Sequence, residues 1–237
     1  MLSEKMISDQ NPQPIRIKFR KVGMLRFISH LDLQRTFAKV LVRAGIPTWY
    51  TQGFNPHAKM VFGLPLSLGT ESECEFLDIR LNKYMTAAEI KYRLNSVLTD
   101  ELAVTDVYEP SMKLQDIGYA LYDIEIITKE ASEALAKKAA ELFGRSPLMM
   151  FKRTKSGEKE IDIAPLIKKT DISFDPCRGV IKMSAMLSAV ADRYLSPEML
   201  IGAMRDSFGI LSGDILTEGY SVVRKNVYLS DGVTEFK

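Results

Sequence analysis

Residues 14–45 read PIRIKFRKVGMLRFISHLDLQRTFAKVLVRAG, and this stretch decides the fold of the first half of the chain. Ile15, Ile17 and Phe19 alternate with basic residues. This period of two is typical of a strand that buries one face. The stretch therefore begins with a predicted strand, which ends before the glycine at position 23.

The same stretch then changes to the spacing of a helix. Ser29 followed by Asp32 is a variant of the capping box, in which a hydroxyl caps the helix and an acidic residue follows three positions later. Gly45 marks the end of the helix, because glycine readily takes the left-handed conformation that follows a last helical turn. The apolar residues that would face the core are Leu33, Phe37, Val40 and Leu41.

Working outward from this stretch, the order of predicted elements is strand, helix, strand, strand, helix, strand, which is the split βαβ or ferredoxin-like unit. Beyond the opening strand and helix, the predicted elements are a strand-like segment at 48–51, a loop at 53–57, a strand at 72–79, a helix at 86–98 and a strand at 104–108.

The second half of the chain repeats this order roughly, with an additional strand near residues 161–163. Strands are predicted at 119–128, 148–153, 180–187 and 220–229, and helices at 131–143 and 197–208. We therefore expect an α+β protein made of tandem ferredoxin-like units, with antiparallel sheets and helices on one face. The expected organisation is a flexible leader at 1–13, an N-terminal unit at 14–110 with both histidines, and a C-terminal unit at 111–237 with an extra strand or hairpin.

Composition excludes several classes of protein. The chain has 237 residues, of which 46% are hydrophobic and 26% are charged, as in ordinary globular proteins. Two cysteines are too few for a cysteine-only zinc site or iron–sulfur cluster, and they suit a reducing compartment. Because neither a long apolar run nor an apolar signal core is present, we expect a cytoplasmic protein that does not enter the membrane.

Charge is distributed unevenly along the chain, although the net charge is only +2. Residues 1–60 contain ten Lys/Arg and three Asp/Glu, a balance of +7. Residues 61–150 contain nine and fifteen, and residues 151–237 contain thirteen and twelve. The basic first segment can attract phosphates or an acidic partner, or it can be a solvated face whose charges are offset by acidic neighbours in the fold.

The two histidines of the chain each lie in a short, dense segment, RFISHLD at 26–32 and GFNPHAK at 53–59. In a ferredoxin-like unit, we expect both segments to lie at the same end of the sheet. There the free N–H groups at the start of the helix favour an anion. The residues expected to form this anion-binding corner are Arg26, Ser29, His30, Gln52, Asn55, His57 and Lys59.

Simpler explanations exist for the same residues. Ser29 can be only a helix cap, and Gly53 and Pro56 can be only turn formers. His30 and His57 are candidate catalytic residues, because two imidazoles can act as the general acid and base that cleave RNA without a metal. Their spacing is not diagnostic of a metal site, so no metal is expected.

Residues 15–81 also resemble the start of a bacterial family known as the radical-SAM-linked uncharacterised proteins. The one departure noted is Ala58, where that family typically has proline. The matching segments are RIKF at 16–19, KVG at 21–23, RFISHLDL at 26–33, RAGIP at 43–47, QGFNPHAKM at 52–60, LSLG at 66–69 and ESE at 71–73.

The resemblance implies a protein that works beside a radical SAM protein, with the cluster cofactor held by that partner and none in this chain. We therefore expect an accessory module that holds an anionic substrate, with RNA as the expected polymer. Two alternatives stay open. One is a metal-independent endoribonuclease similar to the CRISPR repeat-cleaving nucleases, using His30 and His57. The other is a protein-interaction scaffold.

Overall fold

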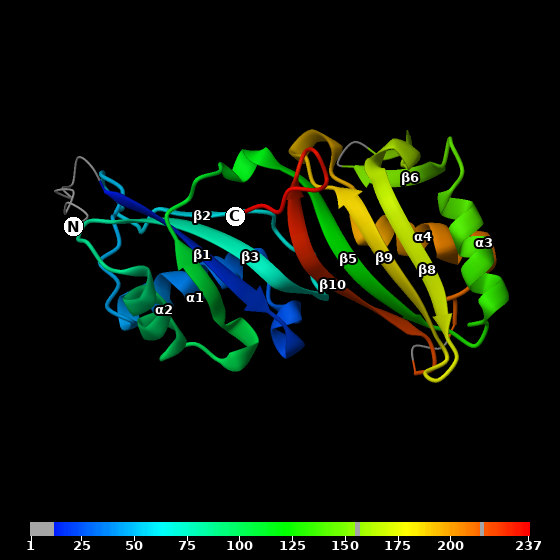
Figure 1. The fold of residues 1–237 in the computed structure, drawn as a ribbon, viewed down its shortest axis with the longest axis horizontal. Helices are drawn as coiled ribbons and strands as arrows, with labels where there is room; N and C mark the ends of the chain where they lie inside the picture. Colours follow the sequence, from blue (N-terminus) through cyan, green and yellow to red (C-terminus); the bar gives the residue numbers. More distant parts are fainter. Residues whose placement is uncertain (1–11, 155–156, 214–215) are drawn as a thin grey trace. The chain divides into compact units, whose positions relative to one another are not determined.

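The structure of the protein is a computed structural model that describes residues 12–154, 157–213 and 216–237 (Figure 1). The chain forms two compact units. Unit 1 comprises the described residues up to Leu114 together with Lys237, and unit 2 comprises residues 115–236. The leader expected at 1–13 falls almost entirely outside the described residues, and Gln13 already belongs to the first strand.

Unit 1 contains an antiparallel sheet. β1 pairs with β4 on one side and with β3 on the other, and β2 pairs with the opposite edge of β3. The order across the unit is therefore β4-β1-β3-β2. These strands are β1 (Gln13–Lys21), β2 (Met60–Phe62), β3 (Thr70–Leu81) and β4 (Val104–Tyr108).

Helix α1 (His30–Arg43) has the limits that its sequence predicts. At its start, the backbone N–H of Asp32 donates to Ser29 Oγ, which satisfies one of the free N–H groups of the first turn. At its end, Gly45 has a φ of +63°, in the left-handed region that favours glycine. Local chemistry alone therefore sets both ends of α1.

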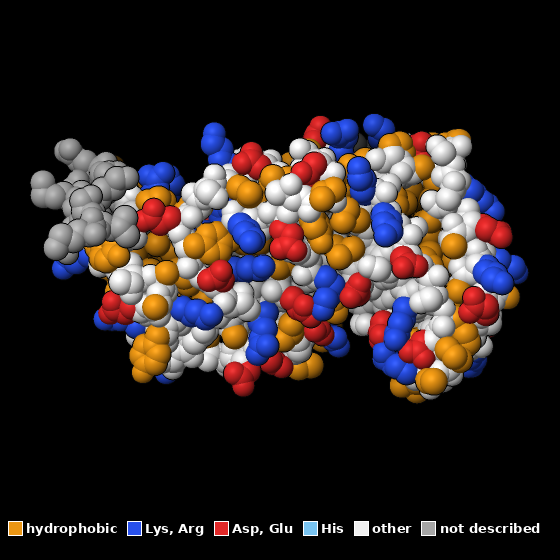
Figure 2. Space-filling view, in the orientation of Figure 1, with side chains coloured by type: hydrophobic (Ala, Val, Ile, Leu, Met, Phe, Trp, Pro, Cys, Tyr) orange, Lys and Arg blue, Asp and Glu red, His pale blue; other side chains and the backbone are white. Residues whose placement is uncertain are grey.

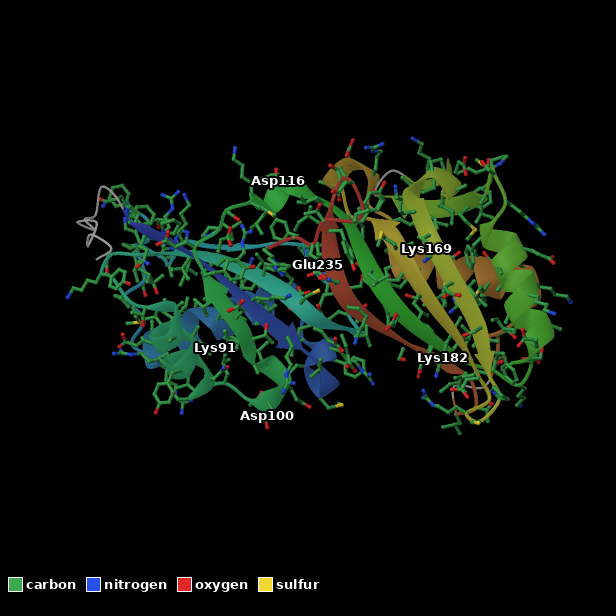
Figure 3. The ribbon with its side chains drawn as sticks, in the orientation of Figure 1. Lys91, Asp100, Asp116, Lys169, Lys182 and Glu235 are labelled. Atoms are coloured by element: carbon green, nitrogen blue, oxygen red, sulfur yellow. The ribbon has the colours of Figure 1, made fainter. Side chains whose placement is uncertain are left out.

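Helices α1 and α2 (Ala87–Asn95) cover one face of this sheet (Figure 1). The alternating apolar residues of β1 pack against them, and the ring of Phe19 lies 4.7 Å from that of Phe37 on α1. Side chains of α2 protect the outer edge of β4. Lys91 donates to the carbonyl of Thr105 (2.6 Å; Lys91 is labelled in Figure 3). Such coverage hinders the edge from pairing with another chain.

In unit 2 the strands pair antiparallel in the order β10-β5-β9-β8, and β6 and β7 form a separate hairpin. Lys182 on β9 pairs with Asp175 at the end of β8 (2.7 Å; Lys182 is labelled in Figure 3). The elements are β5 (Ile117–Ile127), α3 (Glu133–Phe143), β6 (Met149–Thr154), β7 (Gly157–Asp162), β8 (Ile167–Asp175), β9 (Val180–Ser188), α4 (Pro197–Phe208) and β10 (Gly219–Leu229).

Short 3₁₀ helices connect several of these elements. They are η1 (Gly23–Phe27), η2 (Asp100–Leu102), η3 (Leu114–Asp116), η4 (Ala164–Leu166) and η5 (Ala191–Arg193). None of the helices in the described part of the chain is both long and apolar enough to cross a bilayer.

The structure confirms the α+β class, with antiparallel strand pairs within each unit and four α-helices. One strand prediction was wrong: the segment at 48–51 forms only isolated bridges, and the strand that joins this edge of β3 is β2 at 60–62. Strand β8 was missed, because the irregular pairing at Ile167–Lys169 interrupts its alternation. The additional strand expected near 161–163 corresponds to β7, which begins earlier, at Gly157, and ends at Asp162.

Candidate functional site

The two histidine segments border different cavities of unit 1, and among the described residues the structure gives no contact between His30 and His57. The start of α1 lies beside Lys21, which pairs with Ser72 on β3. The loop at 50–58 follows Thr48, which bridges Leu81 at the other end of β3. The His30 ring lies between these two places, since it meets the ring of Phe62, which pairs with Leu77, four residues or about 13 Å along β3 from Leu81.

The course of the chain explains this arrangement. Residues 48–51 do not run along β3 as a full strand, and the chain leaves the sheet edge at Tyr50, which bridges Ala58. The strand β2 follows the loop instead of preceding it. The loop therefore lies at the end of the sheet where α1 ends. A general acid and base must both reach the same phosphate, and among the described residues His30 and His57 share no hydrogen-bond partner.

At the start of α1, acidic side chains offset the basic residues. Arg26 pairs with Glu71 (2.8 Å), and Arg35 pairs with Asp32 (3.4 Å). Ser29 Oγ donates to Asp32 Oδ2 (2.6 Å) in addition to capping the helix. The pKa of Asp32 is lowered, first by the Ser29 hydroxyl, so a carboxylate already occupies the place where an anion would bind.

His30 is half-buried against the core and not directed at a phosphate site. Its ring meets that of Phe62 edge-on at 5.3 Å, and its Nε2 lies 3.0 Å from the side-chain amide of Gln34. Burial, and then the charge of Lys21, lower its pKa. The adjoining cavity, which the buried Glu75 also lines, measures only ≈ 10 Å³, which is room for a water molecule at most.

The loop at 50–58 leaves the edge of the sheet and is held by hydrogen bonds between its own residues. The N–H of Thr51 donates to the His57 carbonyl (2.9 Å), and the N–H of His57 donates to Thr51 Oγ1 (3.2 Å). His57 Nδ1 also lies 3.1 Å from the Asn55 carbonyl. His57 therefore closes the base of the loop, and its own backbone and side chain hold it in place.

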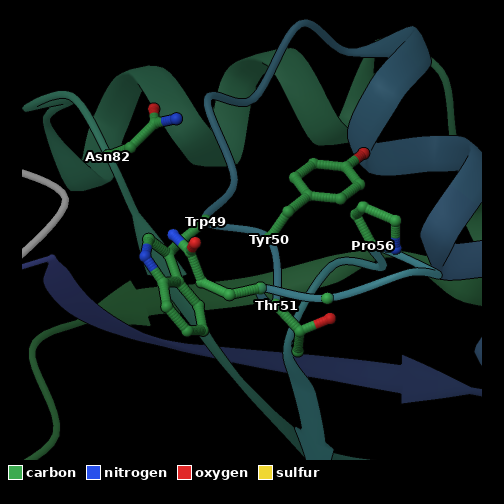
Figure 4. A pocket seen from close by; sticks show the side chains of 7 residues that line it. Trp49, Tyr50, Thr51, Pro56 and Asn82 are labelled. Atoms are coloured by element: carbon green, nitrogen blue, oxygen red, sulfur yellow. The ribbon is translucent and has the colours of Figure 1, made fainter.

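An open cleft of ≈ 340 Å³ lies beside this loop (Figure 4). In Figure 4 the rings of Trp49 and Tyr50 point to opposite sides of the chain, as successive residues of an extended segment do. The residues that line the cleft are Trp49, Tyr50, Thr51, Gln52, Gly53, Pro56 and Asn82. None of these side chains is charged.

Three basic residues stand next to residues that line the cleft, either in contact or in sequence. The Nζ atom of Lys59 lies over the Trp49 ring, 5.9 Å from its centroid. Lys59, Arg80 and Lys83 are exposed, and none of the ion pairs formed among the described residues involves them. On the face of the molecule shown in Figure 2, basic and acidic side chains are intermixed. Attraction of an anion to the cleft therefore depends on these three cations and not on a long-range electrostatic field of one sign.

Of the residues expected to bind, the structure keeps one set together and separates the other. Gln52, Asn55, His57 and Lys59 belong to the loop, and Gln52 lines the cleft. Arg26, Ser29 and His30 belong to the segment that leads into α1, and none of them lines the cleft.

Sequence reasoning missed Trp49 and Asn82 as parts of the site. A usable signal existed for Trp49, since it is the single tryptophan of the chain and stands next to a tyrosine. No sequence signal existed for Asn82, which lies in the connection between β3 and α2. This connection reaches the loop only because β3 pairs with the segment at 48–50.

No group of three or more His, Cys, Asp or Glu side chains within the described residues is arranged to hold a metal ion. The cleft itself offers hydroxyl, amide and aromatic groups, which bind organic ligands better than cations. Its chemistry is therefore that of recognition by stacking and hydrogen bonding.

Comparison with known proteins identifies the family. Residues 14–197 match the family described as "Uncharacterized protein conserved in bacteria (DUF2344)", and the chain belongs to this family. No protein with a curated description matches the chain. The matched region includes unit 1 from residue 14 to Leu114, and with it the cleft beside Trp49.

Proposed function

We propose that the protein is a binding module that holds single-stranded RNA at the cleft beside Trp49, without catalytic activity of its own. The observation that carries this proposal is the position of Lys59 over the Trp49 ring at the edge of an open cleft. Proteins that bind single strands combine a positive groove for the backbone with aromatic rings on which bases stack. Both parts are present at this loop.

The neighbouring residues support the same function. Arg80 and Lys83 are two exposed cations close in sequence to Asn82, which lines the cleft, and Phe54 is fully exposed on the loop. Phosphate contacts of this kind supply most of the affinity for nucleic acid without selecting its sequence. The start of α1 lacks this character, because Glu71 and Asp32 neutralise its basic residues.

For the partner, we propose a radical SAM enzyme that acts on the bound RNA. Its support is the resemblance of residues 15–81 to the radical-SAM-linked proteins. The start of α1 also favours a protein contact, which was the scaffold alternative, because Met24, Phe27 and Leu31 are exposed there. Grouped apolar side chains at a surface typically mark an interaction site. Two cysteines outside any disulfide, Cys74 and Cys177, support a cytoplasmic location.

We also propose that each unit is ferredoxin-like, so that the chain is a tandem repeat. In unit 1 the order β4-β1-β3-β2 supports this assignment. In unit 2 the order β10-β5-β9-β8 is equivalent, since β5, β8, β9 and β10 are its first to fourth strands when the β6–β7 hairpin is treated as an insertion. This repeat would place the proposed RNA site on the first copy.

The test uses the full chain and a fluorescein-labelled single-stranded RNA of about twelve nucleotides. Anisotropy gives the affinity at about 50 and about 200 mM salt, where phosphate contacts predict a marked loss. Because Trp49 is the only tryptophan, its emission should change with the same midpoint. Absence of binding at the lower salt concentration, or binding that leaves the Trp49 emission unchanged, would overturn the proposal.

A further inference from the structure

The cleft beside Trp49 contains two side-chain amides that form no hydrogen bonds within the described part of the protein. Gln52 and Asn82 both line the cleft, and both are exposed. Neither amide forms a hydrogen bond with any residue that the structure describes. Asn82 follows the end of β3, and its backbone N–H donates to the Pro47 carbonyl (2.9 Å), which fixes its position beside the loop.

The distribution of charge around the cleft constrains what can occupy it. The lining consists of neutral aromatic, amide, hydroxyl, glycine and proline groups, whereas the cations Lys59, Arg80 and Lys83 are not among the residues that line it. A matching ligand therefore has a neutral, flat part that forms hydrogen bonds inside the cleft and negative charge outside it. A nucleotide in a single strand has this arrangement, because its base is neutral and its phosphates are charged.

The chemistry of an amide suits the edge of a base. A side-chain amide presents a donor and an acceptor next to each other, and each base edge presents complementary groups at a similar spacing. The Trp49 ring adds a surface for stacking. The cleft volume of ≈ 340 Å³ is at the lower end of the ~300–1,000 Å³ range of small-molecule sites, which fits one nucleotide rather than several.

We propose that the cleft takes one unpaired nucleobase, which stacks on Trp49 and whose edge is read by the amides of Gln52 and Asn82. This inference rests on the proposed function and makes it specific. The recognised RNA must be single-stranded at this nucleotide, because the base edges of a duplex are already paired and its bases are stacked. The flanking phosphates lie toward Lys59, Arg80 and Lys83.

The experiment compares four homopolymer RNAs and one duplex of the same length, each bound to the full chain and followed by anisotropy. The wild-type protein should bind one or two of the homopolymers roughly tenfold more tightly than the others. The double variant Gln52→Ala/Asn82→Ala should lose this preference while keeping the salt dependence. Gln115→Ala, an exposed glutamine outside the cleft, is the matched control and should keep the preference.

The outcomes separate this inference from the proposed function. Equal affinity for single-stranded and duplex RNA, or a base preference that survives the double variant, overturns the reading of a base but leaves RNA binding intact. Failure to bind any RNA overturns both. Gln52 and Asn82 are exposed and make no hydrogen bond to a described side chain, so an unchanged thermal unfolding midpoint is expected for the double variant.

Discussion

The ammonium group of Lys59 lies over the indole ring of Trp49, and the backbone fixes this contact. The N–H of Lys59 donates to the carbonyl of Trp49 (3.2 Å), and the N–H of Trp49 donates to the carbonyl of Arg80 (2.7 Å). Three segments of unit 1 therefore meet at this point. An indole ring beside a lysine is the arrangement that gives the site its expected affinity for a single strand.

Replacing Lys59 with alanine should weaken RNA binding several-fold and reduce the slope of log affinity against log salt by about 1, as expected for one lost phosphate contact. Anisotropy titrations at several salt concentrations measure both quantities. The control is Lys138→Ala, an exposed lysine on α3, which should leave the affinity unchanged. An equal loss in both variants would point to general charge instead of this site.

Replacing Ser29 with alanine should lower the free energy of unfolding by about 1 kcal/mol without changing RNA affinity, because Ser29 caps α1 and the RNA site lies elsewhere. Ser29→Asn should restore most of the stability, since asparagine is an equally good cap. Urea denaturation and RNA titration of both variants provide the measurement. A loss of RNA binding in the stable Ser29→Asn variant would show that the start of α1 takes part in RNA binding.

Replacing Asp78 with alanine should cost about 3 kcal/mol, because it removes the carboxylate from the guanidinium of Arg16, which is only 1% exposed. Both oxygens of Asp78 accept from Arg16, at 2.7 and 2.8 Å. The matched comparison is Glu125→Ala, which breaks a similar two-point pair with the exposed Arg178 and should cost less than about 1 kcal/mol. Similar urea midpoints for the two variants would contradict this contrast.

Stability should fall as the pH decreases through about 6.5, and His30 should be one cause. Burial and the charge of Lys21 lower the pKa of His30 in the folded state below its ordinary value of 6.5. Between these two pKa values the unfolded chain binds a proton that the folded chain does not, so the free energy of unfolding decreases with falling pH.

The measurement is the thermal unfolding midpoint between about pH 5 and pH 8 for the wild type and for His30→Gln. The variant has no imidazole at this position, so its midpoint should depend less steeply on pH over this range. Identical pH profiles would show that His30 does not contribute.

The helices could be predicted from the sequence with good accuracy, because their limits depend on neighbouring residues. Ser29, Thr86 and Ser132 each accept from an N–H three positions later, and each begins a helix. Gly209 ends α4 with a φ of +67° for the same local reason. Strand β8 was missed, because Lys168 and Lys169 stand next to each other and interrupt the alternation of apolar and polar residues.

The candidate site could be predicted only in part. Gln52 and Lys59 were expected to bind from the composition of their segment, and the structure places both at the cleft. Trp49 and Asn82 were not expected there. Their contribution depends on the bridge of Thr48 to Leu81, a pairing between residues 33 positions apart that local patterns do not encode.

By itself, the sequence determined the class of the fold, the ends of its helices and the basic character of its first sixty residues, because these follow from local periodicity, capping and charge. The tertiary structure alone decided which of the two histidine segments carries an open site. That outcome depends on register: because β2 follows the loop at 50–58, the loop lies beside the Leu81 end of β3, whereas the His30 ring meets Phe62 farther along β2. Only pairing between residues distant in the sequence fixes this register.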